Sequence, residues 1–168
     1  SAEDIQAGRI RPSQAMADQL GVDVEFLVYQ FTHYCQQLEQ DGKHQLYLWP
    51  YHCLQGTAGH RLAGVIDAAR LFHAFARGAG NRPIEKGEHP LSERYSVFAE
   101  EVTTAFDGQS LPGIAREHVV IDRLLSADAL VVAGLSSSHC VMETVNDLLA
   151  VIQRRDESRA GRVFLLRD

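Results

Sequence analysis

Apolar residues occur along this chain in two patterns, a repeat every three or four positions and short continuous runs. Together they predict an alternation of helices and strands. From Asp23 onward they return every three or four positions up to Gly42, the pattern of an amphipathic helix that a glycine ends. A second helix carries its apolar face from Leu62 to Phe75 and stops at Gly78. The predicted helices span residues 23–41, 62–75, 95–105, 119–125 and 140–154.

Short apolar runs predict strands over 45–49, 83–86, 129–134 and 162–166. The run from Leu130 to Ala133 is typical of a strand buried inside a parallel sheet. Residues 1–21 are polar and are predicted to be irregular. Because strands and helices alternate, the fold class is predicted as α/β, with a mostly parallel sheet covered by helices on both faces.

Composition narrows the class of protein. The 168 residues suffice for one domain, with residues 1–44 as a peripheral segment and helix and 45–168 as the core. A net charge of −6, with no basic cluster larger than a pair, argues against a nucleic acid partner. The chain has no apolar run of membrane-spanning length. Three widely spaced cysteines argue against a disulfide framework and favour a reducing, cytoplasmic location.

The segment from Ala129 to Leu149 combines a buried strand, a turn of small residues, a cysteine and a helix. Cys140 would occupy the first turn of that helix, where free N–H groups and the helix dipole favour the nucleophilic thiolate. A cysteine in apolar surroundings is more often a small buried hydrophobe. The local pattern leaves both interpretations open, and the nucleophilic one indicates a cysteine hydrolase.

Two further segments carry candidate chemistry. The loop Trp49-Pro-Tyr-His-Cys-Leu-Gln-Gly-Thr-Ala-Gly59 follows a predicted strand, where open α/β sheets place ligands. Its His52 could bind a metal or hydrogen-bond the loop, while Cys53 is expected to pack. Lys86 also follows a predicted strand and could hold a thiolate or carboxylate in its charged form, or could be a solvated surface lysine.

Taken together, the 49–59 loop, the stretch from Lys86 to Phe98 and the stretch from Ala133 to Val141 resemble the isochorismatase-like cysteine hydrolases, which include the nicotinamidases. The wording Trp-Pro-Tyr-His-Cys and Lys-Gly-x-His-Pro is similar to a longer-chain branch of that family. The resemblance spans roughly residues 45–168 and implies a three-layer α/β/α, Rossmann-like fold.

The resemblance also implies roles for individual residues. Cys140 would be the nucleophile and Lys86 the catalytic lysine, with a cis peptide between Leu135 and Ser136. The backbone N–H groups of Ser136 and Cys140 would form the oxyanion hole. His52 matches a metal ligand of the nicotinamidases, so a zinc-like divalent metal is a possible cofactor of the complete protein, although the sequence requires none. Homo-oligomers are common in the family.

The sequence departs from the family pattern at the third catalytic group. The family carries a catalytic aspartate after its first strand, whereas Asp4, Asp18 and Asp23 all lie in polar or helical context. The other metal ligands of the nicotinamidases are also missing from the sequence. We therefore expect a piece of a longer hydrolase that lacks its N-terminal strands and has little activity by itself.

The resemblance implies hydrolysis of the C–N bond of a small amide through a thioester. Three alternatives stay open. The weakest is a metal-dependent hydrolase centred on His52 and His60, because the sequence offers no third ligand at a suitable spacing. An isochorismatase-type enzyme would cleave a vinyl ether without a cysteine nucleophile, which the presence of Cys140 at the turn disfavours. A catalytically inert family member would use the same fold as a binding or scaffold protein.

Overall fold

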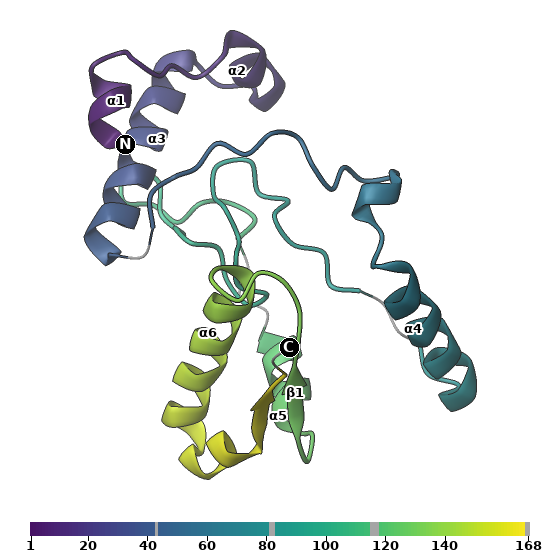
Figure 1. The fold of residues 1–168 in the computed structure, drawn as a ribbon. Helices are drawn as coiled ribbons and strands as arrows, with labels where there is room; N and C mark the ends of the chain where they lie inside the picture. Colours follow the sequence, from purple (N-terminus) through teal and green to yellow (C-terminus); the bar gives the residue numbers. More distant parts are fainter. Residues whose placement is uncertain (43, 81–82, 115–117, 167–168) are drawn as a thin grey trace. The chain divides into compact units, whose positions relative to one another are not determined.

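The computed structural model describes residues 1–42, 44–80, 83–114 and 118–166, and it divides into two compact units. One unit comprises Ser1–Gln45 and Lys86–Asp168, and the other comprises Leu46–Glu85. The elements follow one another along the chain in the colours of Figure 1. In order they are α1 (Ala2–Gln6), α2 (Gln14–Leu20), α3 (Val24–Asp41), η1 (Ala58–His60), α4 (Gly64–Arg77), α5 (His118–Leu125), β1 (Leu130–Val132), α6 (Cys140–Arg155), η2 (Glu157–Arg162) and β2 (Val163–Leu165).

The first 21 residues form two short helices, so the prediction that they are irregular is wrong. Ser1 caps α1 in a reciprocal capping box with Asp4, and the Ser13 side chain accepts the N–H of Met16 at the start of α2. The apolar residues that these helices bury are too few and too small to give a strong periodic pattern. The sequence feature that indicates these two helices is therefore the capping residue at the start of each. Hydrophobic periodicity does not reveal it.

Helix α3 agrees with its prediction at both ends. It runs from Val24 to Asp41, and Gly42 follows in the left-handed conformation with a φ of 63°, which a glycine adopts without strain. Its buried face includes Leu27 and Leu38, and the helix contacts both α1 and α2. Two polar residues, Gln30 and Tyr34, are also buried on this helix, and their partners lie outside it.

The second half of the same unit forms a β–α–β arrangement. Strands β1 and β2 pair in parallel, with Leu130 opposite Val163 and Val132 opposite Leu165, and α6 connects them (Figure 1). Both strands are shorter than predicted. The structure therefore has mixed helices and strands with a small parallel sheet, which is compatible with an α/β fold. The three-layer arrangement stays a prediction.

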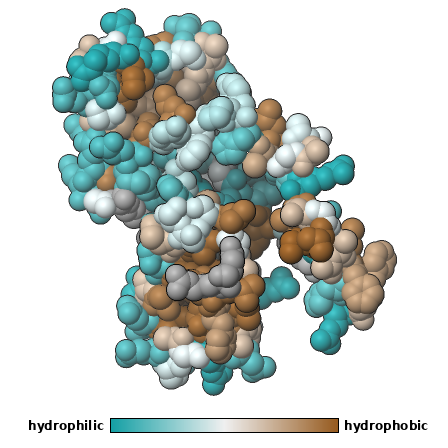
Figure 2. Space-filling view, in the orientation of Figure 1, coloured by the Kyte–Doolittle hydropathy of each residue, from teal (hydrophilic) through white to brown (hydrophobic). Residues whose placement is uncertain are grey.

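A hydrophobic core lies between α5, α6 and the segment that carries Phe98. Its fully buried members are Phe98, Ile121, Leu148 and Ile152, and the partly buried Leu130 packs against them. Apolar side chains also gather at the visible surface around β1 and β2 (Figure 2). Val131 and Phe164, paired with each other, are both more than half exposed there.

Three predicted elements are absent from the described residues. Residues 45–49 and 83–86 form no strand, because neither segment has a described neighbouring strand with which to pair. The predicted helix over 95–105 is an irregular segment that ends in an isolated antiparallel bridge between Thr104 and Ser110. Its polar side chains bond to nearby backbone, as Ser96 Oγ does to the N–H of Phe98 at 3.1 Å, and this competes with helix formation.

The unit formed by Leu46–Glu85 consists of a loop, η1 and α4. Helix α4 ends at Arg77, before Gly78, as predicted, but its apolar face is exposed, including Phe72 and Phe75. Cys53 is exposed as well, so the expectation that it packs is wrong. Across the described parts of the chain, none of the helices combines the length and the apolarity that crossing a membrane requires.

Candidate active site

Cys140 is the first residue of α6, directly after the turn that leaves β1. Gly134 begins this turn with a φ of 143°, a conformation that disfavours any residue with a side chain. The peptide bond between Leu135 and Ser136 is cis. Cys140 is half-buried and not in a disulfide, so its thiol is both placed by the helix and open to reagents.

The turn before Cys140 folds around Ser136. The Ser136 carbonyl accepts hydrogen bonds from the N–H groups of His139 at 3.2 Å and Val141 at 3.1 Å. The Ser136 and Ser138 hydroxyls lie 2.8 Å apart, and the Ser138 hydroxyl lies 2.8 Å from Nδ1 of His139. These bonds fix the backbone that leads into α6, while the serine side chains themselves remain exposed.

The predicted oxyanion-hole donors are the amides of Ser136 and Cys140. In the described structure neither amide donates to a backbone carbonyl, whereas the amides of His139 and Val141 do. An N–H at the first turn of a helix has no intrahelical acceptor, which explains why the Cys140 amide donates to no backbone carbonyl. Both groups are therefore available to a ligand, and their role as an oxyanion hole stays a prediction.

Lys86 lies beside Cys140, although 54 residues separate the two in the sequence. Its Nζ atom donates to the Cys140 sulfur at 3.4 Å, to the Arg94 carbonyl at 3.1 Å and to the Tyr95 carbonyl at 2.9 Å. An ammonium group has three N–H donors, and here each has an acceptor. The Lys86 ammonium therefore lies directly beside the Cys140 sulfur.

The two carbonyls that hold Lys86 belong to an irregular segment, residues 92–102, which we call the lysine platform. Its ends are joined, because the Ser92 hydroxyl donates to the Val102 carbonyl at 2.8 Å and the N–H of Glu101 donates to the Glu93 carbonyl at 2.9 Å. The N–H of Tyr95 also donates to a carboxylate oxygen of Glu101 at 3.3 Å. Hydrogen bonds from side chains and backbone therefore hold this segment, and with it Lys86, without a helix or a strand.

The platform has two further attachments, at Val97 and at Phe98. The N–H of Val97 donates to Thr144 Oγ1 on α6 at 3.1 Å, and Phe98 is buried in the core. Because Cys140 and Thr144 are one helical turn apart, the same helix positions the thiol and the segment that holds Lys86.

Sequence reasoning did not identify Glu93, His44 or His139 as residues around this pair. Glu93 accepts the hydroxyl of Tyr95 at 3.2 Å, and the Tyr95 ring lies 5.5 Å from the ring of His139 and 4.7 Å from that of His44. His139 has the clearest sequence signal of these, since it directly precedes Cys140. The signal for Glu93 is weak, because this residue lies in a stretch of mixed charge that is typical of a solvated loop.

The described residues supply no carboxylate partner for Lys86. All the contacts of its ammonium group go to two carbonyls and one sulfur. Among the residues that the structure describes, the Cys140 sulfur accepts its hydrogen bond from Lys86 Nζ, and no carboxylate bonds to it.

His52 belongs to the unit formed by Leu46–Glu85, and its Nδ1 atom lies 2.7 Å from the Pro50 carbonyl. This bond serves the loop, which is the simpler of the two roles predicted for the residue. Among the residues that the structure describes, no group of three histidine, cysteine, aspartate or glutamate side chains could hold a metal ion. The described residues therefore do not fit a complete metal centre.

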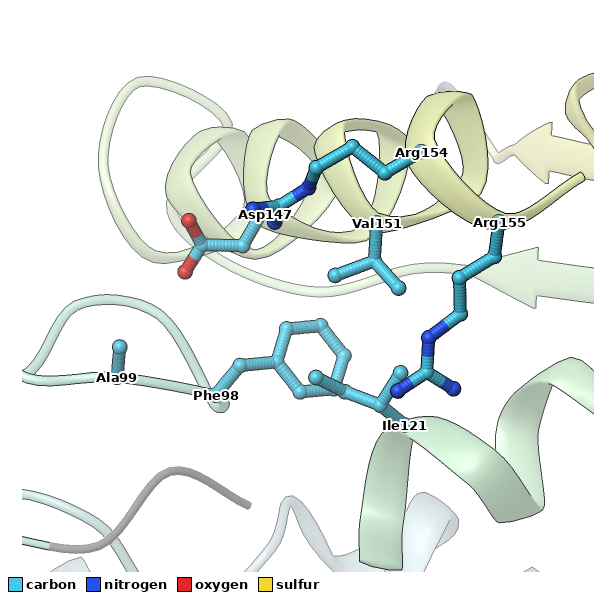
Figure 3. A pocket seen from close by; sticks show the side chains of 7 residues that line it. All are labelled: Phe98, Ala99, Ile121, Asp147, Val151, Arg154 and Arg155. Atoms are coloured by element: carbon cyan, nitrogen blue, oxygen red, sulfur yellow. The ribbon is translucent and has the colours of Figure 1, made fainter. Parts of the chain in front are cut away.

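An open pocket of about 410 Å³ lies at the other end of α6. Phe98, Ile121 and Val151 form its apolar wall, and the side chains of Arg154 and Arg155 extend along it (Figure 3). Asp147, the first α6 residue in its lining, is about two helical turns beyond Cys140. The pocket includes neither Cys140 nor Lys86, so it is separate from the thiol pair.

Comparison with curated proteins finds similarity to the nicotinamidase of Escherichia coli (strain K12), at 31% identity over 109 residues. The alignment covers 65% of this chain and 42% of the relative, so the chain spans less than half the length of the curated relative it matches. No family model matches the chain, and no solved structure matches it. The similarity supports a relationship to the nicotinamidase-related, isochorismatase-like family.

Proposed function

We propose that this chain carries the nucleophile and lysine of a cysteine hydrolase that cleaves the C–N bond of a small amide. The observation that carries the proposal is the 3.4 Å contact between Lys86 Nζ and Cys140 Sγ at the first turn of α6. The similarity to a nicotinamidase, together with the Trp49–Gly59 and Lys86–Phe98 motifs, supports the choice of an amide as substrate.

In the proposed reaction the Cys140 thiolate attacks the carbonyl carbon of the amide and forms a tetrahedral oxyanion. The amides of Ser136 and Cys140 stabilise that oxyanion, a contribution of about 3–4 kcal/mol per donor in comparable sites. The C–N bond then breaks, and ammonia leaves with the proton that the thiol gave up. Water hydrolyses the resulting thioester, which releases the carboxylic acid and regenerates the thiol.

The thiol proton needs a carrier between sulfur and the leaving nitrogen. The family resemblance assigns this task to an aspartate that the chain does not contain, and Lys86 would keep such a base charged. We therefore propose that the 168-residue chain alone has little or no amidase turnover. The complete protein would supply the base from a segment outside this sequence.

The first test measures thiol reactivity and does not require turnover. The chain is treated briefly with iodoacetamide from about pH 5 to about pH 9, and alkylated sites are identified by mass spectrometry. Exposed Cys53 is the internal reference for a thiol without a lysine partner. Labelling of Cys140 that is faster than that of Cys53 below about pH 7 is expected. Equal or slower labelling would reject an activated thiol and favour an inert binding protein.

The second test applies to the complete protein. Cys140→Ala is expected to abolish hydrolysis of a panel of small amides, including nicotinamide, and to leave the circular dichroism spectrum unchanged. Retained amidase activity in this variant would contradict the assignment of the nucleophile. Activity on isochorismate that survives the substitution would instead favour vinyl ether hydrolysis.

A further inference from the structure

We propose that Tyr34, on α3, is a positioning residue that keeps the Lys86 ammonium directed at the Cys140 sulfur. Tyr34 contacts neither residue. It acts on the lysine platform, whose carbonyls at Arg94 and Tyr95 determine where Lys86 Nζ lies. The inference rests on the proposed function in one respect, namely that Lys86 controls the reactivity of the thiol.

Tyr34 binds the platform through two atoms of Glu93, the residue before the two carbonyls. Its hydroxyl donates to Glu93 Oε2 at 2.9 Å and accepts from the N–H of Glu93 at 3.3 Å. Tyr34 is only 1% exposed, so water does not compete for this hydroxyl. The Tyr95 hydroxyl binds the other carboxylate oxygen, which makes Glu93 the link between α3 and the residue whose carbonyl holds Lys86.

Two other residues of α3 bond to the chain just beyond the platform. The Gln30 side chain accepts the N–H of Phe106 at 3.0 Å and donates to the Thr104 carbonyl at 3.4 Å. His33 Nε2 lies 3.1 Å from the Thr104 hydroxyl. Polar residues on an inward helix face cost stability unless they are bonded. The two buried polar side chains of α3, Gln30 and Tyr34, thus both bond to the lysine platform or to the residues that follow it.

The charged and titratable groups around Glu93 are compatible with this role. His44 Nε2 lies 3.8 Å from Glu93 Oε2, and the rings of His44 and Tyr95 contact edge to face. Burial, followed by the negative charge of Glu93, raises the pKa of Tyr34 above its ordinary value, so its hydroxyl remains a donor near neutral pH. Removing that hydroxyl leaves both a carboxylate oxygen and an N–H without this partner.

The test is a double-mutant cycle in the 168-residue chain with Cys53→Ser as background, which removes the exposed competing thiol. The variants are Tyr34→Phe, Lys86→Met and both together. Tyr29→Phe is the matched control, because Tyr29 lies on the same helix but is 53% exposed. Its hydroxyl donates to Glu25 within that helix, and its ring contact with Phe106 is kept in the variant. The readout is the rate of Cys140 alkylation from about pH 5 to about pH 9.

We expect Tyr34→Phe to slow alkylation below about pH 7 by roughly threefold or more, and Tyr29→Phe to leave the profile unchanged. In the Lys86→Met background, Tyr34→Phe should have no further effect on the profile, because its action passes through the lysine. An unchanged profile in Tyr34→Phe, or an effect that persists without Lys86, would overturn the proposal. Glu93→Gln, which keeps the side-chain volume, should act in the same direction and replaces Tyr34→Phe if that variant does not fold.

The cycle separates this inference from the proposed function. If Lys86→Met leaves alkylation of Cys140 unchanged, the lysine–thiol pair itself is inactive and both proposals fail. If Lys86→Met slows alkylation and Tyr34→Phe does not, only the positioning role of Tyr34 is rejected. Circular dichroism on each variant shows that the compared chains are folded.

Discussion

The backbone N–H of Val97 donates a hydrogen bond to Thr144 Oγ1 on α6, over a distance of 3.1 Å. This bond joins the lysine platform to the helix that begins with Cys140. Because a hydrogen bond to a backbone donor contributes about 0.5–1.5 kcal/mol, and a donor left without a partner costs more, Thr144→Val should lower the free energy of unfolding by about 1–2 kcal/mol.

The matched control is Thr144→Ser, which keeps the hydroxyl and removes only a methyl group. Urea unfolding followed by circular dichroism would compare the two variants with the parent chain. A Thr144→Ser variant that loses as much stability as Thr144→Val would show that packing of the methyl group, rather than the bond to Val97, is what matters.

Phe98 attaches the platform to the core, where it is 3% exposed, whereas Phe75 on α4 is 85% exposed. Phe98→Ala should therefore lower the free energy of unfolding by about 3–5 kcal/mol, since it removes a buried ring and leaves a cavity. Phe75→Ala should change it by less than about 0.5 kcal/mol. Chemical denaturation measures both, and similar losses in the two variants would contradict the assigned core.

Because of Tyr34, the free energy of unfolding of this chain should decrease at alkaline pH. Its pKa in the folded chain is raised above the ordinary value near 10, first by burial and then by the charge of Glu93. The unfolded chain therefore releases this proton at lower pH than the folded chain does. The contribution to stability is complete below about pH 10 and falls as pH rises above it. Tyr34→Phe should show a smaller loss of stability across that alkaline range.

The ultraviolet absorbance of phenolate measures the loss of the Tyr34 proton directly. In the folded parent chain, the phenolate signal of Tyr34 should appear only as the protein unfolds. Formation of the Tyr34 phenolate at about pH 10, in a chain that is still folded, would contradict the burial and the bond to Glu93.

The three cysteines should differ in their reaction with alkylating reagents. Cys35 is 2% exposed, and burial raises the pKa of its thiol, so both access and thiolate fraction are low. We expect no labelling of Cys35 in the folded chain over minutes, and full labelling in urea. Cys53, which is exposed, should react in both conditions. Reaction of Cys35 in the folded chain at the rate of Cys53 would show that α3 is not packed as described.

The elements that sequence patterns predicted well are those in which one helix buries one apolar stripe. The repeat of apolar residues and the glycine at position 42 located α3 closely, and the strand, turn and helix around Cys140 are present in the order expected. In these cases local propensity, periodicity and stop signals agree with one another.

The lysine platform could not be predicted in this way. It is held by contacts between residues far apart in sequence, such as Tyr34 with Glu93 and Val97 with Thr144, and no periodicity marks them. The sequence predicts a helix over 95–105 because the apolar residues there have helical spacing. Ser92 and Ser96 instead form hydrogen bonds with the backbone, and these compete with the hydrogen bonds of a helix. Strand predictions at 45–49 and 83–86 failed because a strand needs a partner that no local pattern supplies.

Helix α6 carries Cys140 in its first turn and two core residues, Leu148 and Ile152, in later turns. The thiol is therefore a kinetic reporter of the whole helix. As the core unfolds, the helix terminus and the contact with Lys86 should be lost in the same cooperative event. The pH profile of Cys140 alkylation should then change to that of the unfolded chain at the same denaturant concentration at which the helical signal disappears.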